Sequence, residues 1–222
     1  GSVRIPAAWN DLVGLKTTSG LISLEGVVPL CASFDTVGPL TKTVEDAAHI
    51  FTVLTGRRAM DLANASFSGC RLAVLKGTLF DVTRDTPAQA FDESIAKFEK
   101  AGAEITEVTM DFLSDANTIS GPLFVGEAYG TWKHEIEATP DKMFPRIGDR
   151  FRQGKDVSAA DFVAGWQQLE RYRLRFKSLT NGFDAVICPT APILPPKIDK
   201  LFSDDEYYVT ENLLSLRYTR IA

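Results

Sequence analysis

The stretch from residue 71 to residue 108 constrains the fold of this chain more than any other feature of its sequence. Residues 72–75 (Leu-Ala-Val-Leu) form an apolar run of the length expected for a buried strand. Residues 86–89 (Thr-Pro-Ala-Gln) predict the start of a helix, with the threonine as N-cap and the proline in the first turn, and Gly102 predicts its end. Residues 103–108 predict a second strand. This order and spacing favour two parallel strands joined by a right-handed crossover, and therefore an α/β fold.

Two further helices are predicted from their caps. Thr43 is a suitable N-cap for a helix that ends at Gly56, because glycine tolerates the left-handed conformation that often follows a helix. Ser158 and Asp161 have the spacing of a capping box, and the apolar stripe that follows predicts a helix as far as about Leu179.

The rest of the chain gives coarser predictions. Gly, Pro, Ser and Thr are frequent near the start, which is typical of loops and short strands. The predicted segments are loops and short strands over residues 1–40, a surface connection over 57–70, a helix over 114–138 with a break at Gly121-Pro122, a buried strand from Asp184 that stops at Pro189, and a helix from Thr210.

Charge and hydropathy exclude two classes of partner. The 222 residues carry a formal net charge of -5, so there is no basic excess to neutralise phosphates, and we expect no direct nucleic-acid binding. Arg171, Arg173, Arg175 and Lys177 alternate along the chain, but helical spacing distributes them around the helix, and a solvated face is favoured. No apolar run approaches the roughly 20 residues that span a bilayer, so no membrane insertion is expected.

Cysteine and histidine usage indicates a metal-free protein of a reducing compartment. Cys31, Cys70 and Cys188 are isolated and lack CxxC spacing, which favours a cytoplasmic location with free thiols. With His49 and His134 as the two histidines, both in polar surroundings, neither metal ligation nor a histidine-based catalytic triad is favoured. We expect no metal and no cofactor.

Four motifs occur in a fixed order within the first 56 residues. They are Gly1-Ser2-Val3-Arg4-Ile5-Pro6-Ala7-Ala8, Val13-Gly14-Leu15-Lys16, Ser33-Phe34-Asp35-Thr36-Val37-Gly38-Pro39 and Thr43-Val44-Glu45-Asp46-Ala47-Ala48. Together these motifs resemble the second half of the amidase signature, the defining region of a family of serine hydrolases that cleave carboxylic amides. Weaker similarity continues through residues 126–129, 184–192 and 212–220.

The resemblance implies a catalytic role for the first motif. Ser2 matches the family's nucleophile, which attacks the amide carbonyl and forms an acyl-enzyme. The backbone around Gly1 and Ser2 matches the oxyanion hole. Arg4 is expected to anchor the serine loop through ion pairs, and direct contact with the substrate is the alternative. A serine hydroxyl is a weak nucleophile at neutral pH, so it needs a base and donors for the oxyanion, and flanking glycine lets backbone N–H groups approach closely.

In the family, a lysine and a second serine in a cis peptide relay the proton, and both precede the stretch that matches this chain. We therefore expect the sequence to be an internal part of a longer enzyme. Lys16 belongs to the family's G-L-K element rather than to that relay, which favours a structural role for it.

The resemblance also implies the fold and the partners. The expected fold is α/β, with a mixed, twisted central β-sheet surrounded by α-helices, of which residues 1–222 form part of a single domain. Residues 1–56 would be the signature core, 57–70 a connection and 71–222 the remaining α/β part. The expected substrate is a small-molecule amide, and a homodimer is possible. Two alternatives are a glutaminase subunit of a tRNA-dependent amidotransferase and a non-catalytic truncated or pseudoenzyme form that binds a ligand or partner without turnover.

Overall fold

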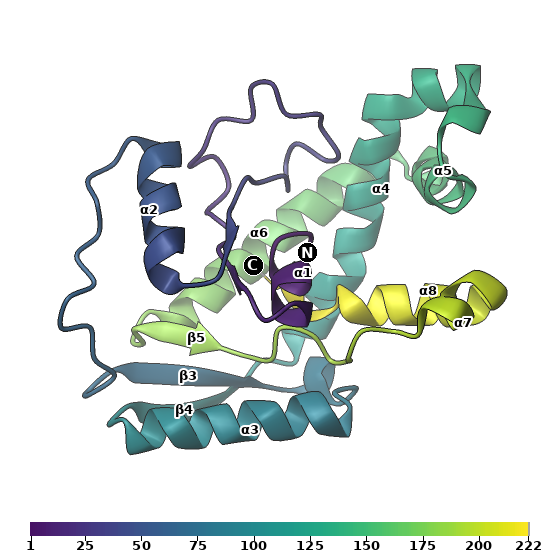
Figure 1. Ribbon diagram of the computed structural model, residues 1–222. Helices are drawn as coiled ribbons and strands as arrows, with labels where there is room; N and C mark the ends of the chain where they lie inside the picture. Colours follow the sequence, from purple (N-terminus) through teal and green to yellow (C-terminus); the bar gives the residue numbers. More distant parts are fainter. Residues whose placement is uncertain (222) are drawn as a thin grey trace. The chain divides into compact units, whose positions relative to one another are not determined.

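The computed structural model describes residues 1–221 and divides into two compact units (Figure 1). The first, called here the sheet unit, comprises residues 1–16, 38–114 and those from 176 onward. The second, the helical unit, comprises residues 17–37 and 115–175. The predicted α/β class is confirmed, and the described strands form a two-stranded antiparallel sheet and a three-stranded parallel sheet. The prediction that the chain forms part of a single domain stays a prediction.

The parallel sheet is the centre of the sheet unit. Strand β3 (Arg71–Lys76) lies between β4 (Glu104–Thr109) and β5 (Ala185–Ile187) and runs parallel to both. Residues 72–75 are all buried, as expected for the middle strand of a sheet that is covered on both faces. Helix α3 (Asp85–Lys100) connects β3 to β4 and runs alongside them (Figure 1), so the predicted parallel crossover is confirmed.

The predicted cap of α3 is wrong. The helix begins at Asp85 after Arg84, so Thr86 lies inside the first turn instead of before it. The reason is tertiary, because the Arg84 N–H donates to the Pro192 carbonyl at 2.9 Å and the Arg84 side chain pairs with Glu211. These contacts fix Arg84 in an extended conformation and start the helix there.

The other elements of the first 70 residues include one helix that was not predicted. Helix α1 (Arg4–Trp9) replaces the expected loop, because Ile5 and Ala7 are buried. The prediction of loops and short strands holds elsewhere, where the antiparallel sheet pairs β1 (Val13–Gly14) with β2 (Leu40–Thr41).

Helix α2 (Val44–Thr55) has the predicted caps. The Thr43 hydroxyl accepts the Asp46 N–H at 3.0 Å, and Gly56 has the left-handed conformation with φ of 64°. Residues 57–70 contain neither helix nor strand, which confirms the predicted connection.

Three short helices complete the C-terminal part of the sheet unit. They are α7 (Ile198–Ser203), α8 (Asp205–Ser215) and the 3-10 helix η4 (Tyr218–Arg220). Helix α8 begins five residues before the predicted Thr210, because the Asp204 side chain accepts the Tyr207 N–H and caps it. A further 3-10 helix, η1 (Thr78–Phe80), follows β3.

The helical unit contains most of two long helices and one short one. Helix α4 (Phe112–Ala138) enters the unit at Asp115, α5 (Pro145–Arg152) follows, and α6 (Ala159–Thr180) belongs to it up to Arg175. The 3-10 helices η2 (Pro140–Lys142) and η3 (Gln153–Asp156) lie between them in sequence.

The predicted Ser158 capping box of α6 is confirmed, since Ser158 Oγ accepts the Asp161 N–H at 3.0 Å. The four cations of α6 are exposed, as predicted.

The predicted break in α4 is wrong, because the helix continues through Gly121 and Pro122. A proline inside a helix removes one hydrogen bond and costs roughly 3 kcal/mol or more. Apolar burial after the proline offsets this cost, since Leu123, Val125 and Ala128 are all buried.

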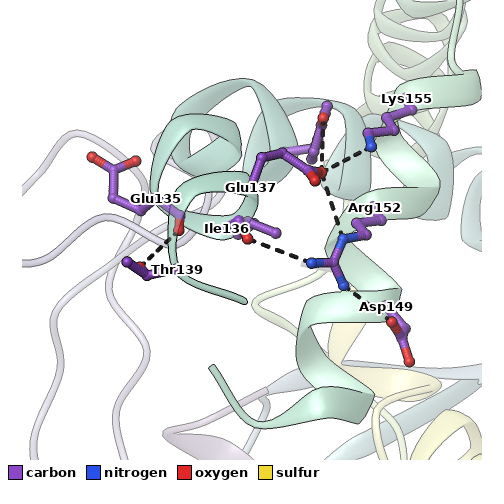
Figure 2. A network of polar contacts seen from close by, with 8 residues as sticks. Glu135, Ile136, Glu137, Thr139, Asp149, Arg152 and Lys155 are labelled. Carbon is purple, nitrogen blue, oxygen red and sulfur yellow. Dashed lines mark hydrogen bonds and ion pairs between the residues drawn. The ribbon is translucent and has the colours of Figure 1, made fainter. Parts of the chain in front are cut away.

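A polar network lies on the surface of the helical unit where α4, α5 and η3 meet (Figure 2). The Glu137 carboxylate contacts Lys155 Nζ at 2.8 Å and Arg152 Nε at 3.5 Å, and it accepts the Tyr129 hydroxyl at 3.2 Å. Arg152 also pairs with Asp149 at 3.2 Å. We call these five residues the Glu137 network.

Candidate active site

Ser2 lies in the turn that leads into α1, and its side chain is exposed. The Ile5 N–H donates to the Gly1 carbonyl at 3.0 Å, which closes the turn over the serine. A Cβ at Gly1 would overlap the end of the Leu216 side chain and lie 3.2 Å from Thr219 Oγ1, so a side chain there would displace Leu216.

Arg4 connects this turn to the C-terminal segment. Its guanidinium donates to the Thr219 backbone carbonyl, and its Nε is buried without a hydrogen-bond partner among residues 1–221. Burial lowers the pKa of Arg4, while a nearby Cys188 raises it. Cys188 follows β5, so Arg4 lies near the carboxyl end of a parallel strand, where α/β proteins commonly bind ligands.

The turn is electropositive. Arg4, Lys16 and Arg220 all lie close enough to Gly1 to act on it electrostatically. Burial, and then the charge of Arg4, lower the pKa of Lys16. Positive charge near Ser2 would favour the oxyanion that forms when a hydroxyl adds to a carbonyl.

Cys31 and Cys188 are not suited to serve as nucleophiles. Burial raises the pKa of Cys188 to about 11, against the opposing effect of Arg4, so its thiol is protonated at neutral pH. Burial and then Glu127 raise the pKa of Cys31 well above its ordinary value. All three cysteines, including Cys70, are free.

The Ser33–Pro39 motif begins in the helical unit, where it fixes a loop against α4. The Ser33 N–H donates to Glu127 Oε1 at 2.8 Å, and Asp35 Oδ2 accepts the Cys31 N–H at 3.0 Å. Trp132 Nε1 adds a hydrogen bond to the Pro29 carbonyl at 2.8 Å. These contacts give the motif a structural role within the unit.

The two histidines lie outside the Ser2 turn, on helices α2 and α4, and both are exposed. Within the part of the chain that the structure describes, no group of His, Cys, Asp and Glu side chains is arranged to hold a metal ion. Across the same residues, no helix combines the length and apolar character needed to cross a membrane.

The motifs identify Arg4 as a support of the serine loop, but they do not single out the residues of the C-terminal segment that hold it. Thr219 accepts the Arg4 guanidinium, and the preceding Tyr218 has 1% of its surface exposed. The weak family similarity over 212–220 was the available signal, but it gave no individual residue a role.

Comparison with known proteins agrees with the motifs. The family described as Amidase matches residues 1–220, and the chain belongs to this amidase family of hydrolases. The chain is 30% identical to the 2-amino-5-chloromuconic acid deaminase of Comamonas testosteroni, over 100% of this chain and 49% of that protein. It is 32% identical to the glutamyl-tRNA(Gln) amidotransferase A subunit of Ligilactobacillus salivarius, over 97% of this chain and 52% of that protein.

Solved structures share the fold. A crystal structure described as an amidase has a TM-score of 0.82 and 25% identity, covering 98% of this chain and 51% of that one. An allophanate hydrolase of Kluyveromyces lactis also has a TM-score of 0.82, at 22% identity, covering 100% of this chain and 38% of that one. The chain spans about half the length of the curated relatives it matches.

Proposed function

We propose that the chain carries the nucleophile of an amidase and that Ser2 is this nucleophile. The observation that carries the proposal is the exposed Ser2 hydroxyl in a tight turn, within a family match that covers residues 1–220. Ser2 Oγ bonds to the amide carbonyl carbon as its proton passes to a base. The C–N bond then breaks, and the amine or ammonia leaves with a proton. Water hydrolyses the resulting ester, which releases the acid and restores Ser2.

The surroundings of Ser2 suit this chemistry. The backbone at Gly1 and Ser2 would donate to the oxyanion, and the positive charges of Arg4 and Lys16 would stabilise it further. The family resemblance assigns the proton relay to a lysine and a second serine that precede this motif. The proposed reaction is run by protein side chains with no metal or cofactor, on a small-molecule amide and in the cytoplasm. A homodimer stays a prediction.

A second candidate is the glutaminase subunit of a tRNA-dependent amidotransferase. It is favoured by the similarity to several amidotransferase A subunits, including those of Clostridium acetobutylicum and Ligilactobacillus salivarius. Glutamine would then be the amide that Ser2 attacks. A full-length protein that releases ammonia from glutamine, and does so faster with partner subunits, would favour this candidate over a free-standing amidase.

A serine-directed fluorophosphonate probe tests the nucleophile. We expect the full-length protein to be labelled on Ser2, and Ser2→Ala to lose both the label and ammonia release from amides. Ser19→Ala is the matched control, since Ser19 is another exposed serine of the chain and should leave both unchanged. Peptide mapping that finds the label on a different serine, with Ser2 unmodified, would overturn the proposal.

A further inference from the structure

We propose that Tyr218 is a positioning residue that holds the Ser2 turn through the Thr219 carbonyl. The assignment of a catalytic purpose to this positioning depends on the proposed function of Ser2. The contacts that connect the two residues are independent of it. We call the connected residues Thr83, Tyr218, Thr219 and Arg4 the tyrosine clamp.

The clamp begins at the segment between β3 and α3. The Thr83 hydroxyl donates to the Phe80 carbonyl at 2.6 Å and accepts the Tyr218 hydroxyl at 2.6 Å, and the Tyr218 hydroxyl oxygen also lies 3.3 Å from the same carbonyl. The Tyr218 ring packs against the Phe80 ring with centroids 4.9 Å apart. Next to it, Arg217 Nε donates to the Leu79 carbonyl at 3.0 Å. Helix η4 is therefore fixed to the segment that follows β3.

The clamp ends at the candidate nucleophile. Thr219 follows Tyr218 directly, and its carbonyl accepts the Arg4 guanidinium. Arg4 is two residues from Ser2, and the Gly1 backbone lies against Leu216 and Thr219. A displacement of η4 would consequently move both the acceptor of Arg4 and the surface on which Gly1 rests.

A second contact connects helix α8 to the segment between β3 and α3. Glu211, whose side chain is 2% exposed, pairs with Arg84 at the start of α3. This ion pair fixes α8 but contacts neither η4 nor the Ser2 turn directly. The tyrosine clamp can therefore be weakened while α8 stays in place, which separates positioning of the turn from general stability.

Tyr218→Phe is the variant that isolates the clamp. It removes the hydroxyl and leaves the ring against Phe80, while the Thr83 hydroxyl keeps its hydrogen bond to the Phe80 carbonyl at 2.6 Å. No buried polar group loses its last partner, so we expect little loss of stability. The matched control is Tyr207→Phe, because Tyr207 on α8 also uses its hydroxyl, which accepts the Lys197 N–H at 3.3 Å.

Two measurements on the full-length protein test the clamp. Hydrogen exchange at the amides of residues 2–5 and 7 reports the mobility of the turn, and the rate of fluorophosphonate labelling of Ser2 reports its reactivity. We expect Tyr218→Phe and Thr83→Val each to accelerate exchange and to slow labelling about three- to ten-fold, the range that the loss of one hydrogen bond supports. The double variant should add little to either, because both changes break the same contact. Tyr207→Phe should change neither.

The outcomes separate the clamp from the proposed function. Unchanged exchange at residues 2–5 and 7 in Tyr218→Phe overturns the clamp, whatever the labelling. If Tyr218→Phe shows faster exchange but Ser2 is never labelled even in the wild type, the clamp is supported and the proposal that Ser2 is the nucleophile is overturned. Tyr218→Phe and Tyr207→Phe could also lose labelling in the same proportion to their loss of melting temperature. Tyr218 would then act only through stability, and the positioning proposal would be overturned.

Discussion

The sheet unit and the helical unit are each held together by charged and polar side chains, but in different surroundings. In the sheet unit, Glu211 is 2% exposed and pairs with Arg84. In the helical unit, the carboxylate of Glu137 is 43% exposed where it meets Lys155, whose side chain is 47% exposed. The Glu137 network has more ion pairs, yet each of its charges can be solvated when a partner is removed.

This difference indicates that burial, and not the number of contacts, decides what a polar interaction is worth. A buried carboxylate without its cation must either stay charged in a poorly solvated place or take up a proton, and the cost of breaking such a pair is several kcal/mol. An exposed pair exchanges its partner for water at little cost.

The largest expected effect is that of Arg84→Ala, which leaves the Glu211 carboxylate buried without its partner. We expect a loss of about 3 kcal/mol in the free energy of unfolding, measured by urea denaturation. Arg71→Ala is the control, because Arg71 is exposed to a similar degree but pairs with an Asp184 that is 50% exposed. The decrease in unfolding free energy for Arg71→Ala should be much smaller, because water replaces the partner of an exposed carboxylate. Equal losses in the two variants would show that burial of the carboxylate does not matter here.

An intermediate effect is expected from Gly154→Ala, next to the Glu137 network. A Cβ at Gly154 would overlap the Val125 carbonyl and lie 2.6 Å from Tyr129 Cβ, so η3 would have to move away from α4. We expect a loss of about 1–3 kcal/mol in unfolding free energy.

Gly130→Ala in α4 provides the control of opposite sign. A Cβ there meets nothing within 4 Å, and alanine is favoured over glycine inside a helix by about 1 kcal/mol. If Gly130→Ala is destabilised as well, the loss in Gly154→Ala cannot be attributed to the close contact between η3 and α4.

The smallest effect is expected from Glu137→Gln and should appear as a change in pH dependence. The hydrogen bond from Lys155 is the main cause that lowers the pKa of Glu137. A carboxyl whose folded pKa is lowered stabilises the fold above its ordinary pKa, and this contribution disappears as the pH falls through the folded value. The melting temperature of the wild type should exceed that of Glu137→Gln slightly at pH 7.

The same difference should vanish as the pH falls below the folded pKa of Glu137, and at pH 7 it should shrink with added salt because the network is exposed. If the difference in melting temperature persists at low pH, the introduced glutamine acts by disturbing packing and not by removing the charge of Glu137. His134→Gln, on the same helix but outside the Glu137 network, is a control that should leave the acid limb of the curve unchanged.

The sequence predicted the features that depend on neighbours in the chain. The caps of α2 and α6 follow from Thr43 and Ser158, because a cap is formed by a side chain and an amide three residues away. The parallel pairing of β3 with β4 follows from the length of the connection. The family motifs likewise identified Ser2 as the candidate nucleophile from residues that are adjacent in sequence.

The tertiary structure decided the features that depend on residues far apart in the chain. Helix α3 begins at Asp85 because Pro192 and Glu211 hold Arg84, and α4 passes Pro122 because the residues beyond it are buried. Tyr218 and Thr83 are 135 residues apart, and no local pattern indicates that they meet. A side chain pairs with whatever the fold brings within about 3 Å, so the surroundings of Ser2 could be read only from the folded chain.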